Sequence, residues 1–317
     1  MPRHLRSLAR PLLLVTLALS LPACLERRQT GQLNPDGSGK MTLDTYVTPP
    51  PQEPGSPSQP DALDIAKSIA TNMVQDSTGV DVWSNLVVEK TADGRAHVVG
   101  TAYFPDINKL GLDNRFTYAW ARDDKGAYTL TLKPPANNTA AMTPVGGEKL
   151  SDAQVAQVIA QGKAEYAQRK PWLQTNLQFL KVDATLLLPG EVTSTTILTQ
   201  SGQNAVELTF DGRQILDAFD TLMADDKTLA ASIRAGKQPD ADMGYLVEAM
   251  FHHKGPIQAT VTGPVKPQFD YKAAVAAAKA AAPAMYQRLG IDPNARPSPM
   301  PGTIAPMPVP QTPSPQH

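Results

Sequence analysis

The residues that could take part in catalysis or metal binding are few. Histidine occurs five times, at His4, His97, His252, His253 and His317. His252 and His253 are adjacent, so on a helix their side chains would point about 100° apart and could not both face one metal ion. The chain contains no HExxH, GxSxG, GxGxxG or CxxC motif. We therefore predict no catalytic residue, no metal site and no bound cofactor.

Acidic pairs are the other candidates for chemistry. They stand at predicted turns or helix starts, where turn formation and the helix dipole account for them. The pairs are Asp123-Asp124, Asp225-Asp226 and Asp240 with Asp242. Similarly, His252 and His253 precede Lys254-Gly255-Pro256, a pattern typical of a helix C-terminus. Two carboxylates that cleave a glycoside come together only in the fold, so the sequence leaves a carboxylate-based hydrolase open.

Cys24 is the single cysteine of the chain, and it follows a basic and then an apolar segment. Arg3, His4, Arg6 and Arg10 form the basic start, and residues 11–21 are mainly leucine, valine and alanine. These are the n- and h-regions of a secretory signal. The apolar run ends at Pro22, short of the roughly 20 residues that a membrane-spanning helix needs. With one cysteine, the chain forms no internal disulfide.

The sequence Leu21-Pro22-Ala23-Cys24 resembles the lipobox of bacterial lipoproteins, in which a small residue precedes a cysteine that is acylated and becomes the mature N-terminus. Leu21 and Ala23 fit this pattern, whereas Pro22 stands where a small or hydroxylated residue is more usual. The resemblance implies that residues 1–23 are a signal peptide and that Cys24 carries several acyl chains, such as palmitate, which anchor the protein stably. Leu25, in place of aspartate, implies the outer membrane if the host has one. The alternative is an ordinary signal peptide that leaves a free thiol.

The charge of the chain argues against nucleic acid as a partner. Removal of the three arginines in residues 1–23 leaves 26 of 29 basic residues against 30 acidic ones, a formal charge of −4. Nucleic-acid binding needs a concentrated basic face, and the longest basic runs are Arg27-Arg28 and Arg169-Lys170. The candidate partners are therefore the membrane, through lipidated Cys24, and a protein of the envelope or the cell wall.

Proline divides the chain. Residues 49–60 hold six prolines and residues 292–317 hold nine, without a periodic apolar stripe in either segment. We expect the first to be an extended spacer and residues 291–317 to be a disordered tail, unless the tail is a ligand for a proline-binding partner. The predicted units are residues 1–23, 24–48, 49–60, 61–290 and 291–317.

A β-hairpin is predicted between the cysteine and the first proline-rich segment. Pro35 and Gly37 supply turn geometry, and Met41, Leu43, Thr45 and Val47 alternate with polar residues. The run GSGK at residues 37–40 lacks the earlier glycine of a phosphate-binding loop. The sequence LNPDGSGK after a lipobox resembles uncharacterised bacterial lipoproteins that open with such a hairpin, which implies no particular activity.

The first half of the main unit is predicted to be one helix followed by an antiparallel meander. The helix begins at Asp61 and ends by Gly79, and strands cover residues 80–89, 95–104, 115–122 and 127–133. Phe116, Tyr118 and Trp120 share one face of the third strand, and Tyr128, Leu130 and Leu132 share a face of the fourth. These side chains form either an aromatic-lined groove or the core of the sheet.

The second half repeats this order of helix and then strands. A helix is predicted from Ser151 to about Arg169, where Pro171 ends or restarts it. Strands follow at residues 179–188, 192–199 and 205–210, then helices at 214–224, 227–235 and 240–253, and a strand at 257–262. A helix over residues 271–289 completes the unit, and Pro283 is expected to kink or split it.

Together these patterns predict an α+β fold, with antiparallel sheets and packed helices, on a lipid-anchored extracytoplasmic protein. Its predicted role is non-catalytic, as a module that binds or scaffolds a partner in the envelope. The alternative is a surface-tethered hydrolase. A deep cleft holding two carboxylates, or His97 beside a carboxylate and a hydroxyl, would favour the enzyme.

Overall fold

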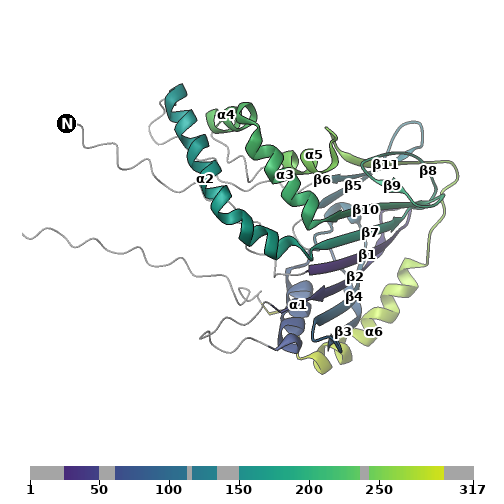
Figure 1. The fold of residues 1–317 in the computed structure, drawn as a ribbon. Helices are drawn as coiled ribbons and strands as arrows, with labels where there is room; N and C mark the ends of the chain where they lie inside the picture. Colours follow the sequence, from purple (N-terminus) through teal and green to yellow (C-terminus); the bar gives the residue numbers. More distant parts are fainter. Residues whose placement is uncertain (1–24, 50–60, 113–115, 134–149, 236–242, 296–317) are drawn as a thin grey trace, which may run out of the picture.

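The computed structural model describes residues 25–49, 61–112, 116–133, 150–235 and 243–295, without the side chains of residues 243–245. Within these residues the protein has the predicted α+β fold (Figure 1). Several residues singled out above lie outside the described part of the chain, namely Cys24, Asp240, Asp242 and His317.

Seven strands form the larger sheet, in the order β3-β4-β2-β1-β7-β10-β9. Their bounds are β1 Leu25–Leu33, β2 Gly39–Val47, β3 Val82–Lys90, β4 Ala96–Phe104, β7 Lys181–Leu187, β9 Thr199–Gln200 and β10 Ala205–Asp211. All neighbours pair antiparallel except β1 and β7, which are parallel. The sheet is therefore mixed, with one parallel pair at its centre.

The predicted N-terminal hairpin occupies that centre. Gly37 adopts a positive φ of 85° in its turn, where glycine has no steric cost, and its amide donates to the carbonyl oxygen of Asn34 at 3.0 Å. Met41, Leu43 and Val47 alternate with the outward residues of β2 and are fully buried, as the pattern predicted. The sequence left open whether this hairpin joins the main sheet, and in the structure it supplies two of the middle strands.

Four shorter strands form the second sheet, in the order β5-β6-β11-β8. They are β5 Thr117–Arg122, β6 Tyr128–Lys133, β8 Glu191–Thr196 and β11 Ile257–Thr262. The expectation of one continuous meander over residues 80–133 is thus wrong, because β3 and β4 belong to the larger sheet and β5 and β6 to the smaller one. A short 3-10 turn, Ile107–Lys109, lies between the two pairs.

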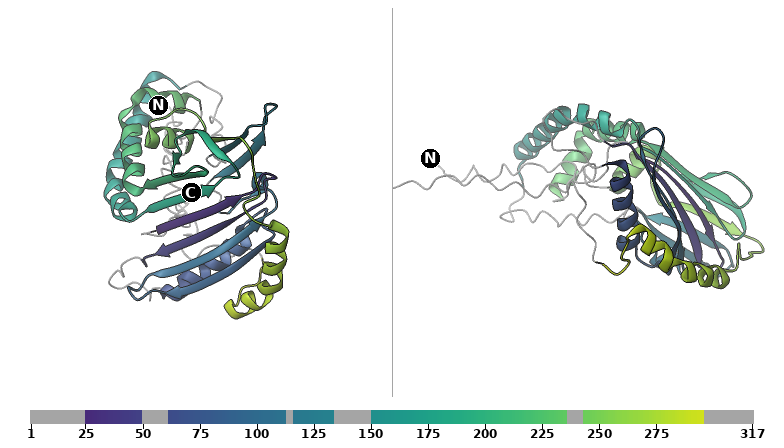
Figure 2. Two further views of the ribbon diagram at one scale, coloured as in Figure 1. Left: turned by 90° about the vertical axis from the view of Figure 1, so that its right-hand side faces the viewer. Right: turned by 90° about the horizontal axis from the view of Figure 1, so that it is seen from below.

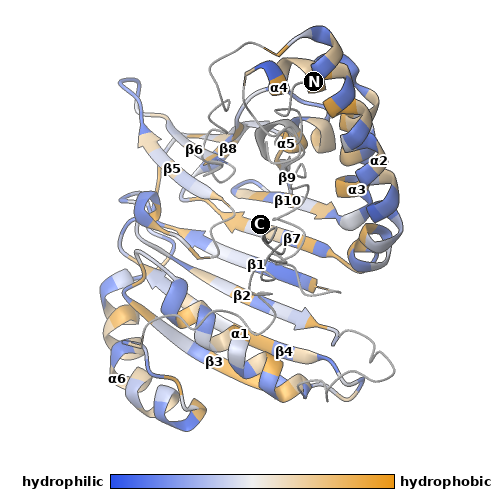
Figure 3. Ribbon diagram, turned by 90° about the vertical axis from the view of Figure 1, so that its left-hand side faces the viewer, coloured by the Kyte–Doolittle hydropathy of each residue, from blue (hydrophilic) through white to orange (hydrophobic). Residues whose placement is uncertain are grey.

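In the described part of the chain, six α-helices pack around the sheets: α1 Ala62–Asp76, α2 Asp152–Leu177, α3 Gly212–Ala224, α4 Asp226–Arg234, α5 Met243–Phe251 and α6 Tyr271–Leu289. Helix α1 lies across β4 and β3 (Figure 3). Helices α2 to α5 gather at one side of the molecule, and α6 runs along β3 at the sheet's edge (Figure 2). One large apolar core joins most of the buried residues of both sheets and the helices.

Two prolines lie inside helices that the sequence predicted they would interrupt. Pro171 stands within α2, which continues to Leu177 instead of ending near Arg169, and α6 is continuous through Pro283. Burial explains the first case, because Leu173 and Leu177 beyond the proline are almost fully buried. Packing of that last segment offsets the lost hydrogen bond. Figure 1 shows α2 turning toward the sheet in its second half, as a proline kink would allow.

Candidate binding site

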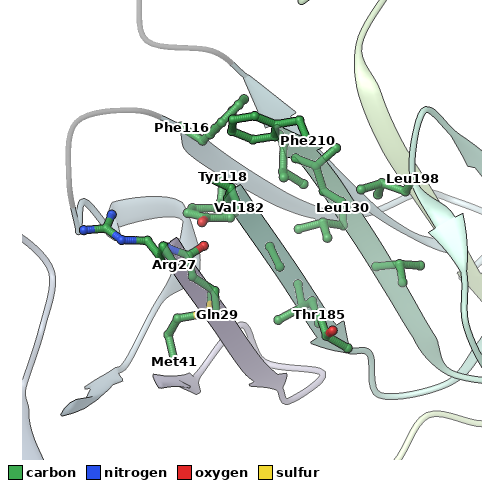
Figure 4. A pocket seen from close by; sticks show the side chains of 15 residues that line it. Arg27, Gln29, Met41, Phe116, Tyr118, Leu130, Val182, Thr185, Leu198 and Phe210 are labelled. Carbon is green, nitrogen blue, oxygen red and sulfur yellow. The ribbon is translucent and has the colours of Figure 1, made fainter. Parts of the chain in front are cut away.

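An apolar hollow lies between the two sheets (Figure 4). Strands β1, β2, β7 and β10 of the larger sheet provide one wall, and β5 and β6 of the smaller sheet provide the other. The lining side chains are mostly aliphatic or aromatic.

Strand alternation explains why these side chains point into the hollow, because residues two apart on a strand share a face. The register places Arg27 beside Val182, and Val182 beside Phe210, in one row across β1, β7 and β10. The next row consists of Gln29, Ala184 and Leu208. Each row therefore crosses three strands, and the second row lies two residues further along β1 and β7 than the first.

The hollow is only partly closed. Arg27, Gln29, Phe116, Tyr118, Ala184 and Phe210 are partly exposed, whereas other lining residues, such as Val182, Leu208 and Leu130, are buried. The empty space between its walls is about 710 Å³ including open solvent, so the enclosed part is smaller and the hollow is a narrow slot.

The chemistry of this slot suits an apolar ligand. Small-molecule sites are mostly apolar clefts with a few polar groups that fix orientation. Here the polar side chains Arg27 and Gln29 stand on β1. A mostly apolar lining with few polar side chains suits an apolar group.

The predicted aromatic faces on β5 and β6 contribute to both the core and the slot. Trp120 is buried, stacks on Tyr128 with ring centroids 5.0 Å apart, and donates from its indole nitrogen to the carbonyl oxygen of Pro35 at 3.1 Å. Phe116 and Tyr118, on the same face, are half-buried and line the hollow. Trp120 therefore belongs to the core, as one interpretation of the pattern predicted, whereas Phe116 and Tyr118 line the hollow, as the other did.

His97 lies away from the hollow, on the outer face of the larger sheet. Its Nε2 is 2.8 Å from Asp44 and its Nδ1 is 2.7 Å from Glu89. The imidazole ring also stacks on the Tyr46 ring, with 4.2 Å between the ring centroids. The guanidinium carbon of Arg95 lies 4.8 Å from the centroid of the Tyr46 ring. Both ring nitrogens are engaged by carboxylates, so this arrangement differs from a nucleophile–base pair, in which one nitrogen faces a hydroxyl.

The acidic pairs that the structure describes form turns and caps. The Asp123 carboxylate accepts from the amides of Lys125 and Ala127 in the turn between β5 and β6. Asp225 caps α4 by accepting from Thr228, whose hydroxyl and amide hold the pKa of that carboxyl below its usual value. Among the described residues, no group of three or more histidine, cysteine or acidic side chains could hold a metal ion.

His252 and His253 follow the last residue of α5, as the stop signal predicted. His252 adopts a left-handed conformation with φ of 50°, and the amide of His253 donates to the carbonyl oxygen of Glu248 at 3.2 Å. Their position is therefore that of residues that end a helix.

Sequence reasoning missed the slot as such. Its walls come from strands that lie far apart in the chain, and β10 contributes Val206, Leu208 and Phe210 to it. The sequence predicted a strand over residues 205–210, but pairing between distant strands decides what that strand's faces meet.

Cys24 lies outside the described residues, but the residue bonded to it is described. Leu25, bonded to Cys24, begins β1 and is 3 % exposed. In the described ranges of the chain, none of the helices combines the length and apolar character that crossing a bilayer requires.

Comparisons with known proteins give little guidance. No protein-family model matches the chain, and no curated protein matches it significantly. Among solved structures, the NMR structure of the folded domain of LppM from Mycobacterium tuberculosis is similar with a TM-score of 0.30 and 10% sequence identity, over 78% of this chain and 93% of that one. Similarity this low supports no inference about shared function.

Proposed function

We propose that the chain is a lipid-anchored envelope protein that binds an apolar ligand in the slot between its two sheets. The observation that carries the binding role is the slot, whose lining is mostly apolar, with Arg27 and Gln29 as the polar side chains of β1 that line it. No step of catalysis is part of the proposal.

The anchor rests on sequence. Cys24 follows Ala23 at the end of a basic and then apolar leader, the arrangement that resembles a lipobox. Several acyl chains on one cysteine would hold the protein stably, since each buried CH₂ contributes about 0.8 kcal/mol. The finer expectation, the outer membrane, rests on Leu25 after the cysteine and applies to a host with two membranes.

The anchor is tested by replacing its sulfur. Cys24→Ser should release the protein from the membrane fraction, and intact-mass analysis of the unmodified chain should show acyl groups on Cys24. A C24S protein that stays as firmly bound, or a free thiol in the native protein, would contradict the anchor.

The slot is tested separately, with cis-parinaric acid, a fluorescent fatty acid, titrated into full-length C24S protein. We expect saturable binding that Ala184→Phe weakens about tenfold or more, corresponding to ~1.4 kcal/mol, because a ring at this position fills the slot. The matched control is Thr209→Phe, which adds the same ring on neighbouring β10 at an exposed position of the opposite face. An equal loss of affinity in both variants, or no binding to the C24S parent, would overturn the proposal.

A further inference from the structure

Two aromatic side chains are unusually exposed. Phe179 is 59 % exposed and Trp172 is 46 % exposed, the highest values for large apolar residues in the part of the chain that the structure describes. Isolated exposed apolar residues are common. These two are notable because they are large, near each other in the chain, and held by a rigid framework.

That framework is the end of α2 and its connection to β7. Leu177 and Leu180, on either side of Phe179, are buried. The amide of Leu180 donates to Leu177 at 2.9 Å, and the carbonyl oxygen of Leu180 accepts from the amide of Gly212 at 3.0 Å. Phe179 is therefore presented to solvent from a backbone that is fixed on both sides.

Trp172 lies in the last part of α2, and Phe179 is two residues beyond its last residue, Leu177. They are seven residues apart in the chain. They form a small aromatic surface, which we call the α2 aromatic face.

The α2 aromatic face lies at the end of the sheet where the lipidated residue would be. Strands β1 and β7 run parallel, with Glu26 paired to Lys181. Phe179 precedes Lys181 by two residues, just as Cys24 precedes Glu26 by two. Consecutive Cα atoms are 3.8 Å apart, so an acyl group on Cys24 is tied to the same end of the two central strands.

A further apolar residue is exposed at this end. Leu63, in the first turn of α1, is 36 % exposed. Asp61, which caps the same turn, forms an ion pair of 3.1 Å with Lys90, the last residue of β3. Because β3 ends where β4 and β1 begin, this pair fixes the start of α1 at the anchor end.

We propose that this end of the molecule rests on the bilayer, with Trp172 and Phe179 in the interfacial layer beside the lipid anchor. The proposal rests on the lipidation of Cys24 under the proposed function. Aromatic side chains favour the boundary between headgroups and acyl chains. The α2 aromatic face therefore contacts the membrane that holds the anchor. Cys24 is bonded directly to buried Leu25, so no linker holds the folded body away from that membrane.

Tryptophan fluorescence offers a direct test, since the chain has three tryptophans. Trp83 and Trp120 are buried at 2 % and 8 % exposure, so Trp172 reports on the surface. The native lipidated protein is reconstituted into vesicles of phosphatidylcholine or of brominated phosphatidylcholine, whose bromine quenches tryptophan at contact range. We expect lower fluorescence in brominated vesicles, and we expect this difference to disappear in Trp172→Phe.

A matched control moves the exposed tryptophan to the opposite end. Gln203 is exposed just before β10, which begins beside the last residue of β7. That position is on the order of 20 Å from the anchor end, at 3.3 Å per strand residue. The double variant W172F/Q203W keeps three tryptophans, and it should show no difference between the two lipids.

The outcomes separate this inference from the anchor. Intact mass and vesicle flotation establish acylation first. Acylated, floating protein whose fluorescence is the same in both lipids, or is quenched equally in W172F/Q203W, overturns the orientation and leaves the anchor standing. Protein without acyl groups that does not float removes the premise, and with it the orientation.

Discussion

Gly212 is the residue at which a single added methyl group should do most damage. It begins α3 and lies against the end of α2, where a Cβ would be 1.8 Å from the carbonyl oxygen of Leu177 and 2.6 Å from its carbon. These are backbone atoms in a buried junction, which cannot move aside as a flexible side chain can. Gly212→Ala should therefore separate α2 from α3.

The magnitude follows from two opposing effects. Alanine is favoured over glycine in a helix by up to about 1 kcal/mol. Relief of the contact requires the carbonyl oxygen to move by more than 1 Å, since Cβ contacts under 3.0 Å do not occur. Overpacking in a rigid core costs about 1–3 kcal/mol, and sometimes more. We expect a net loss of about 2 kcal/mol or more, which lowers Tm by roughly 4–8 °C for a chain of this size.

Thermal unfolding followed by circular dichroism measures this effect. The matched control is Gly202→Ala, because a Cβ at Gly202 meets its nearest neighbour at an ordinary 3.5 Å and the position is an exposed turn. We expect G202A to match the parent within about 0.5 kcal/mol, as surface changes usually do. If G212A unfolds at the same temperature as G202A, the close approach of α2 and α3 is wrong.

Two further predictions concern buried polar contacts. The Tyr166 hydroxyl donates to Asp220 at 2.9 Å, and burial together with that carboxylate raises the pKa of the tyrosine. Tyr166→Phe should lower the free energy of unfolding by about 1 kcal/mol at pH 7. Because the folded-state pKa of Tyr166 lies above the unfolded value of about 10, the difference in stability between the two proteins, measured by urea unfolding, should shrink as pH rises above 10. A difference that stays constant with pH would contradict the contact. Asn34 is buried and accepts from the amide of Gln268 at 2.7 Å, so Asn34→Ala should cost about 2 kcal/mol by leaving that amide without its partner. Hydrogen exchange at Gln268 should become faster in that variant, and unchanged protection would count against the bond.

Local pattern was enough to predict most elements. The bounds of β11 and α6 agree with the predicted ranges 257–262 and 271–289, and Asp61 and Ser151 cap α1 and α2 as expected. Each of these depends on residues close together in the chain. Alternation and capping are local properties, so a single sequence carries them.

Pairing between distant strands was not predictable in the same way. The parallel contact of β1 with β7 and the contact of β6 with β11 join segments that are more than a hundred residues apart. Alternation states which side chains share a face, but any strand with a complementary face would satisfy it. The division of the expected meander into two sheets follows from this freedom.

The same limit applies to the candidate site. Phe116 and Tyr118 were correctly placed on a shared face with Trp120, but whether such a face becomes core or cleft depends on the strand opposite. Residues on β10 opposite them gave no separate signal. A slot formed between layers has no sequence motif, in contrast to a metal or phosphate site.

The place of β1 changes what the first proline-rich segment can do. Residues 49–60 were expected to be a spacer after an anchored hairpin. However, β2 before this segment and β4 beyond it pair along their whole length, so both belong to one sheet. The segment therefore connects two elements of the same body and does not separate the body from Cys24. The only covalent link between the proposed anchor and the folded body is the bond from Cys24 to Leu25, which begins a strand paired on both sides. An anchored protein of this design would be held close to its membrane and in a restricted orientation, which is the premise that the quenching of Trp172 tests.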